Sequence, residues 1–172
     1  MMKDVVISIR AIQACDMDDE DLVEFTTDGL YTYDGEVGCL SYMESEVTGL
    51  EGTRTSVLVM PDQVVVDRDG LITSRMIFKE GERSSFLYNT PYGTATMNIN
   101  TRRIRRQVGE HGGDVEIDYV VDMEHAVVTR NKFQLNITEQ NIMGEQCHAY
   151  HDPECQRQYQ PDFERRLPEG RR

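Results

Sequence analysis

Alternating apolar and polar residues run through most of the chain in short segments. Val, Ile, Thr, Tyr and Phe recur at every second position, and turn-forming residues interrupt the pattern roughly every 8–12 residues. A period of two is typical of a strand with one buried face, because successive side chains point to opposite sides of a sheet. The pattern predicts strands at 3–14, 22–34, 36–46, 53–60, 63–68, 71–79, 82–90, 94–105, 114–122 and 126–138.

These consecutive short strands must hide their edges, because exposed strand edges invite aggregation. They can close into a barrel or pack as two sheets, and short turns between neighbours favour an up-and-down barrel. Asp34-Gly35 predicts a two-residue hairpin turn, and Gly29 inside a strand pattern predicts a bulge or a bend. The predicted fold class is therefore all-β, a single antiparallel up-and-down barrel of about 8–10 strands.

The composition changes after residue 138. Gln, Arg, Pro and His become frequent and β-branched residues become rare, while Asp152-Pro153 is typical of a helix start. We predict a barrel domain over 1–138 and a C-terminal extension over 139–172 that is partly helical or disordered.

Charge and hydropathy exclude several classes of protein. The chain has 172 residues, with 31 Asp or Glu against 18 Lys or Arg, which gives a net charge of −13. This acidity argues against nucleic-acid binding. No apolar run approaches the roughly 18 residues of a membrane helix, and no secretory signal follows the start, so we expect a cytoplasmic protein that does not bind membranes.

The middle of the chain resembles a known bacterial family. The stretch 42–55 is similar to the signature of the YwiB-like proteins of unknown function, and segments at 24–33, 66–81, 88–93 and 117–137 agree with it in order. The resemblance implies a calycin-like barrel, related in shape to lipocalins and fatty-acid-binding proteins. It implies no activity. The Gly-x-Trp signature of secreted lipocalins is missing, since the chain has no Trp.

A barrel of this size encloses either a packed core or a cavity for one small molecule. Tyrosines and a few charged residues recur among the apolar residues of the predicted strands, which is typical of a pocket for an amphipathic ligand. The candidate ligand-binding residues are Tyr42, Glu44, Arg68, Arg75, Tyr88 and Tyr119. In the alternative interpretation, Glu44 pairs with an arginine and orders a filled core.

Two further groups of residues have weaker chemical signals. Cys147, His148, His151 and Cys155 fall close together, but their spacing is not a common zinc pattern, and we predict no metal site and no cofactor there. The run 102–106 contains four arginines that a strand splits between its two faces, so we interpret it as a solvated strand end. No catalytic signature occurs, and we predict a protein that is not an enzyme.

Two hypotheses about function follow. The first is a barrel that binds a small apolar or anionic molecule. The second is an interaction or structural module with a filled barrel, whose acidic N-terminal half and basic C-terminal end contact a partner. The sequence leaves the oligomeric state open between a monomer and a homodimer.

Overall fold

The structure, a computed structural model, describes residues 2–16, 19–123 and 127–140. Nearly all of these residues lie in ten strands joined by short turns, with one 3₁₀ turn, η1 (Glu46–Thr48). The strands are β1 (Lys3–Asp16), β2 (Asp19–Tyr33), β3 (Gly38–Met43), β4 (Arg54–Val59), β5 (Val64–Asp69), β6 (Ser74–Phe78), β7 (Arg83–Thr90), β8 (Gly93–Gly109), β9 (Gly112–Met123) and β10 (Val127–Glu139).

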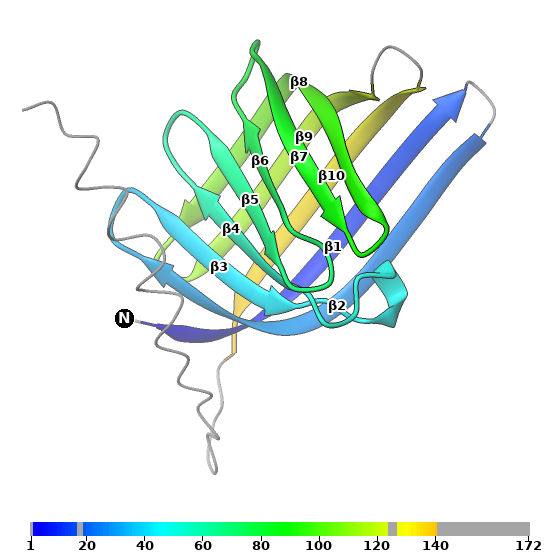
Figure 1. The fold of residues 1–172 in the computed structure, drawn as a ribbon. Coiled ribbons are helices and arrows are strands. Elements are labelled where there is room, and N and C mark those ends of the chain that lie inside the picture. The colour runs from blue at the N-terminus through cyan, green and yellow to red at the C-terminus, as the bar shows by residue number, and fades with distance from the viewer. Residues whose placement is uncertain (1, 17–18, 124–126, 141–172) are drawn as a thin grey trace, which may run out of the picture. The chain divides into compact units, whose positions relative to one another are not determined.

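All ten strands belong to one antiparallel sheet whose order is β6-β5-β4-β3-β2-β1-β10-β9-β8-β7. Each strand pairs with its neighbour in sequence, except that β1 also pairs with β10 and that β6 and β7 form the two ends of the sheet. These ends approach each other through paired backbone hydrogen bonds of 3.0 and 2.9 Å between Thr73 and Asn89. The sheet therefore forms a nearly closed up-and-down barrel (Figure 1), and the predicted fold class is confirmed.

The barrel combines two kinds of strand. β1, β2, β8, β9 and β10 have 12 to 17 residues, whereas β3, β4, β5 and β6 have five or six. The long strands curve along one side of the barrel in Figure 1, and the short strands face them. Because of this difference in length, the first part of β2, before Leu30, pairs with β1 alone. From Leu30 onward β2 also pairs with β3.

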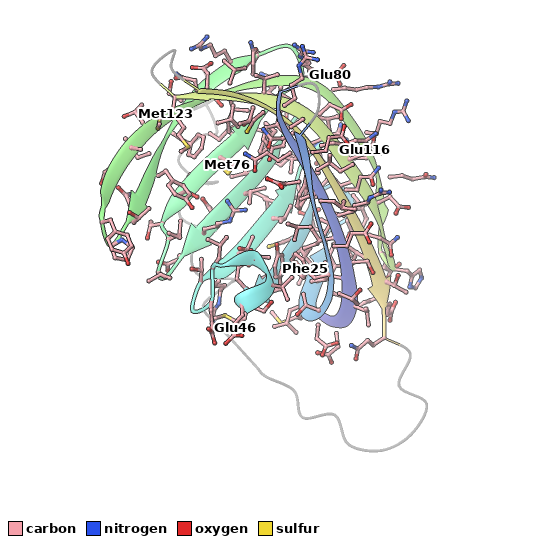
Figure 2. The ribbon with its side chains drawn as sticks, turned by 90° about the vertical axis from the view of Figure 1, so that its right-hand side faces the viewer. Phe25, Glu46, Met76, Glu80, Glu116 and Met123 are labelled. Atoms are coloured by element: carbon pink, nitrogen blue, oxygen red, sulfur yellow. The ribbon has the colours of Figure 1, made fainter. Side chains whose placement is uncertain are left out.

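The core lies in the interior of the barrel. One cluster of buried side chains includes members of every strand, and most are the β-branched and aromatic residues that suit a pleated surface. On the short strands, alternate residues point inward, as the alternating burial of β4 and β6 shows. Phe25 and Met76 are among the side chains marked in Figure 2.

One local prediction is wrong, and one of the two alternatives of another is excluded. β2 and β3 are joined by four residues, Asp34 to Val37, because Asp34 Oδ1 accepts hydrogen bonds from the amides of Glu36 and Val37 at 2.9 and 2.7 Å. The pairing of β2 with β1 is unbroken at Gly29, so there is no bulge there. The C-terminal extension lies outside the described residues except for its start, where Gln140 N donates to Asp4 O.

Candidate functional site

A polar row crosses the inner face of the short strands. Tyr42 on β3 lies opposite Thr55 on β4, Thr55 lies opposite Arg68 on β5, and Arg68 lies opposite Ser74 on β6. We call these four residues the polar row. Tyr42, Thr55 and Ser74 are buried, and Arg68 is half-buried. The next inward positions along the same strands are Leu40, Val57, Val66 and Met76, so the row marks a sharp boundary with an apolar core.

Glu44 lies one position beyond Tyr42 along the inner face and is only 6% exposed. Its two carboxylate oxygens accept hydrogen bonds from two hydroxyls, Oε1 from Thr55 at 2.6 Å and Oε2 from Thr48 at 2.8 Å. Thr48 closes η1, and Gly49 after it adopts a φ of 71°. The loop between β3 and β4 thus brings a hydroxyl to the buried carboxylate.

Arg68 has weaker partners than Glu44. Its Nη1 donates to the Met76 sulfur at 3.5 Å, a poor acceptor, and its buried Nε has no hydrogen-bond partner. No carboxylate among the described residues lies within the 4.0 Å limit of an ion pair with its guanidinium. The interpretation that Glu44 pairs with an arginine therefore finds no support in the contacts of Arg68.

Two further buried hydroxyls also lack a hydrogen-bond partner. One belongs to Ser74, the cross-strand neighbour of Arg68, and the other to Thr101 on β8. Thr101 lies opposite Tyr119 on β9, and the Tyr119 ring contacts Phe78 edge-on, with 4.7 Å between the ring centroids. The interior thus has buried polar atoms without hydrogen-bond partners on the short strands β5 and β6 and on the long strand β8.

The tyrosines of this region remain neutral well above ordinary pH. Burial raises the pKa of Tyr42, and the charge of Glu44 raises it further, while the charge of Arg68 opposes the shift. Burial likewise raises the pKa of Tyr119, again against the charge of Arg68. Arg68 therefore lies close enough to both phenols to act on them electrostatically, and both phenols are hydrogen-bond donors at neutral pH.

The structure brings together five of the six predicted residues. Tyr42, Glu44, Arg68 and Tyr119 face the interior as described, and Tyr88 on β7 packs against the core. The Thr73–Asn89 bridge sets an antiparallel register that places Tyr88 beside Ser74 and extends the polar row across the seam of the barrel.

Arg75 lies apart from the others. It is exposed on the outer face of β6, where its Nε is 3.9 Å from Asp67 Oδ1. Period two explains this placement, because Arg75 lies between the inward residues Ser74 and Met76.

Sequence reasoning missed the hydroxyl residues of the site. In the sequence these residues are indistinguishable from ordinary strand or turn residues: Thr48, Thr55, Ser74 and Thr101. The one available signal is alternation. Once the register is known, it assigns Thr55 and Ser74 to the inner face of the barrel.

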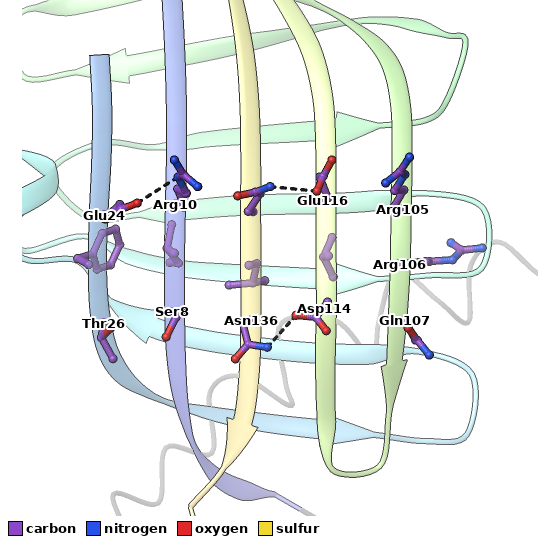
Figure 3. A pocket seen from close by; sticks show the side chains of 15 residues that line it. Ser8, Arg10, Glu24, Thr26, Arg105, Arg106, Gln107, Asp114, Glu116 and Asn136 are labelled. Carbon is purple, nitrogen blue, oxygen red and sulfur yellow. Dashed lines mark hydrogen bonds and ion pairs between the residues drawn. The ribbon is translucent and has the colours of Figure 1, made fainter. Parts of the chain in front are cut away.

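A second concave region lies on the outside of the barrel. It is an open hollow of about 770 Å³ on the outer face of β2, β1, β10, β9 and β8. Polar side chains from neighbouring strands line it in two rows, as Figure 3 shows. Most of them are already paired, Arg10 with Glu24 at 3.1 Å, Gln134 with Glu116 at 3.0 Å and Asn136 with Asp114 at 2.7 Å. These six side chains are therefore already engaged within the protein.

Other predicted features lie elsewhere. Cys147, His148, His151 and Cys155 are outside the described residues, and the described residues contain no cluster of three His, Cys, Asp or Glu side chains placed to bind a metal. The arginines of the run 102–106 are all exposed on β8, as expected for a solvated strand, and a bulge interrupts the pairing there between Thr101 and Arg103. The described residues also include no helix with the length and apolarity to cross a bilayer.

The fold and the interior define a class of protein: an antiparallel up-and-down β-barrel with polar side chains on part of its inner wall. Within that class, the chain belongs to a family described as a domain of unknown function (DUF1934), whose model matches residues 7–135.

Among solved structures, the chain is similar to the YwiB protein from Bacillus subtilis, with 20% identity, a TM-score of 0.72, and coverage of 81% of this chain and 93% of that one. This similarity shows the fold alone. No curated protein matches the chain.

Proposed function

We propose that the barrel binds a small organic molecule at the polar row. The observation that carries this proposal is the set of three buried polar atoms without partners, on Arg68, Ser74 and Thr101. Buried polar groups in native proteins are almost always hydrogen-bonded, and each exception costs about 1–3 kcal/mol. Three exceptions within one interior favour a site that is completed by a ligand.

The surroundings of the polar row suit such a ligand. Half-buried apolar side chains pack against the core, and two of them lie near the row. The ring centroids of Phe25 and Tyr42 are 6.4 Å apart, and the register puts Tyr88 beside Ser74. An apolar wall with a few convergent polar groups is the usual composition of a small-molecule site. The proposal concerns binding and includes no chemical step.

The test uses a neutral apolar dye, N-phenyl-1-naphthylamine, whose fluorescence rises on transfer from water to an apolar site. We expect saturable binding of one dye per barrel. Ser74→Leu, which fills the interior at the polar row, should weaken dye binding by about tenfold, which corresponds to roughly 1.4 kcal/mol.

Ser85→Leu is the matched control, because Ser85 is exposed on the outside of β7. Its dye affinity should equal that of the wild type. Circular dichroism shows whether both variants retain the β-rich fold. Equal dye affinity in the two variants, or no saturable binding together with a native mass free of any adduct, would exclude the polar row as a ligand site.

The second candidate is an interaction module, and the outer hollow favours it. In that case a partner would contact the outer face of the long strands, where Arg105 and Glu116 line the hollow. Binding of such a partner should weaken as salt rises and should be lost in Arg105→Glu, while dye binding inside the barrel stays unchanged.

A further inference from the structure

We propose that the ligand of the barrel carries a single carboxylate, and that Arg68 binds this group from inside the polar row. This inference rests on the proposed function and adds to it the charge and the chemical class of the ligand. It starts from a difference between the two charged groups of the site, Glu44 and Arg68.

The acidic group of the site is satisfied by the protein itself. Both oxygens of Glu44 accept hydrogen bonds from threonine hydroxyls, at 2.6 and 2.8 Å, and the residue is buried. A cationic ligand would have to compete with these short bonds for the same oxygens. Glu44 is therefore better suited to shape the site than to bind a ligand.

The basic group is left unsatisfied. The Nε of Arg68 is buried without a partner, and its Nη1 donates to the thioether sulfur of Met76. A guanidinium presents its N–H groups in a planar fork that fits a carboxylate with two parallel hydrogen bonds. A carboxylate would give Arg68 the counter-ion that the described residues do not provide.

Hydroxyl groups beside Arg68 fit the same ligand. Ser74 lies directly across from Arg68 and its buried Oγ has no partner. The charge of Arg68 also acts on Tyr119, whose phenol is a protonated donor. A carboxylate has about four acceptor positions, so it can take hydrogen bonds from the arginine and from these hydroxyls together.

The charge of Glu44 limits the ligand to one negative charge. Glu44 is close enough to raise the pKa of Tyr42 through its charge, so its field reaches the polar row. A phosphate monoester carries close to two negative charges at neutral pH and has one cation to meet here, beside a carboxylate. Arg68 and Glu44 together therefore favour a monoanion.

The experiment compares three probes with the same eight-carbon chain: octanoate, octan-1-ol and octyl phosphate. Each probe displaces N-phenyl-1-naphthylamine from the barrel, and the displacement constant gives its affinity. We expect octanoate to bind at least about tenfold more tightly than either of the others. Arg68→Met should remove this preference by lowering the affinity for octanoate to that for octan-1-ol.

Arg75→Met is the control, because Arg75 is on the neighbouring strand but on the outer face of the barrel. It should leave all three affinities unchanged. Arg68→Lys keeps the charge without the planar fork and should retain part of the preference for octanoate.

The outcomes separate this inference from the proposed function. Equal binding of octanoate and octan-1-ol, or no displacement of the dye by octanoate, would overturn the carboxylate and leave interior binding in place. Tighter binding of octyl phosphate would overturn the single charge. An equal loss in Arg75→Met would show that Arg68 has no special role. A barrel that does not bind the dye at all contradicts the proposed function itself.

Discussion

Replacing Arg68 by methionine should stabilise the ligand-free protein. Arg68 gains little from hydrogen bonds in the folded protein, because its buried Nε has no partner and its Nη1 donates to a sulfur. If the residue serves a ligand, the folded protein bears the cost of the buried, unpaired Nε of Arg68 until the ligand arrives. An apolar side chain at this position avoids that cost, and residues kept for function are often destabilising in this way.

The magnitude follows from three terms. Removing a buried N–H without a partner gains about 1–3 kcal/mol. The attraction between Arg68 and Glu44 is lost, but it acts beyond the 4.0 Å of an ion pair and is worth about 1 kcal/mol. The contact with the Met76 sulfur is replaced by an apolar contact of similar size. We expect Arg68→Met to raise the free energy of unfolding by about 1 kcal/mol.

Urea unfolding followed by far-ultraviolet circular dichroism measures this change. The protein is first unfolded and refolded to remove any bound molecule, because a ligand that binds only the folded state would add to its stability. Arg75→Met should lie within about 0.5 kcal/mol of the wild type, since its ion pair is exposed. The slope of free energy against urea should be the same in all three proteins.

A loss of more than about 1 kcal/mol in Arg68→Met would refute this reasoning. It would mean that the guanidinium stabilises Glu44 and the core, as in the interpretation of a filled barrel. An unchanged stability would show that the unsatisfied Nε has no cost in the folded protein.

Three other changes test the fold by urea unfolding. Gly29→Ala should cost about 1–3 kcal/mol, because an added Cβ would clash with an Ile7 methyl and lie 2.7 Å from the Ser41 carbonyl oxygen. Gly109→Ala is the control: its Cβ meets nothing within 4 Å, and it should cost less than about 1 kcal/mol. Burial raises the pKa of Tyr31 to about 12, so between pH 10 and 12 the unfolded chain loses a proton that the folded chain keeps. The free energy of unfolding should therefore fall by up to about 2 kcal/mol over this range, and Tyr31→Phe should reduce its dependence on pH. Asp34→Ala should cost about 1 kcal/mol at neutral pH. Hydrogen bonds from backbone amides lower the pKa of Asp34 in the folded state. The stabilisation is therefore present above the pKa of Asp34 in the unfolded chain and should be lost as the pH falls through its pKa in the folded protein.

The fold follows from the sequence because each strand carries its own signal. Alternation gives the strand and its inward face, and turns that join neighbours in sequence leave few ways to order the sheet. The longer turn after Tyr33 and the absence of a bulge at Gly29 have physical causes that no pattern shows. The Asp34 carboxylate organises a longer turn than its glycine suggests, and Gly29 makes room for the tight packing of Ile7 and Ser41 rather than for an extra residue.

The candidate site could be predicted only in part. Alternation indicates that Tyr42, Arg68 and Tyr119 share an apolar interior, but it does not show which hydroxyls lie beside them. That information depends on register across several strands, because Thr55 and Ser74 approach Arg68 only through cross-strand pairing. Whether a buried polar atom has a partner depends on side-chain geometry, which a sequence pattern does not contain.

The position of the site follows from the unequal lengths of the strands. The part of β2 before Leu30 pairs only with β1, so the end of β3, at Tyr42 and Met43, has β4 on one side and no strand on the other. The loop from Glu44 to Thr53 fills this place, where η1 contacts β2 and Thr48 reaches the Glu44 carboxylate. Polar side chains can be kept at this end because the loop provides hydroxyls that a strand would point elsewhere. The loop satisfies Glu44, whereas no described carboxylate pairs with Arg68, and the proposed binding of an acid rests on this asymmetry.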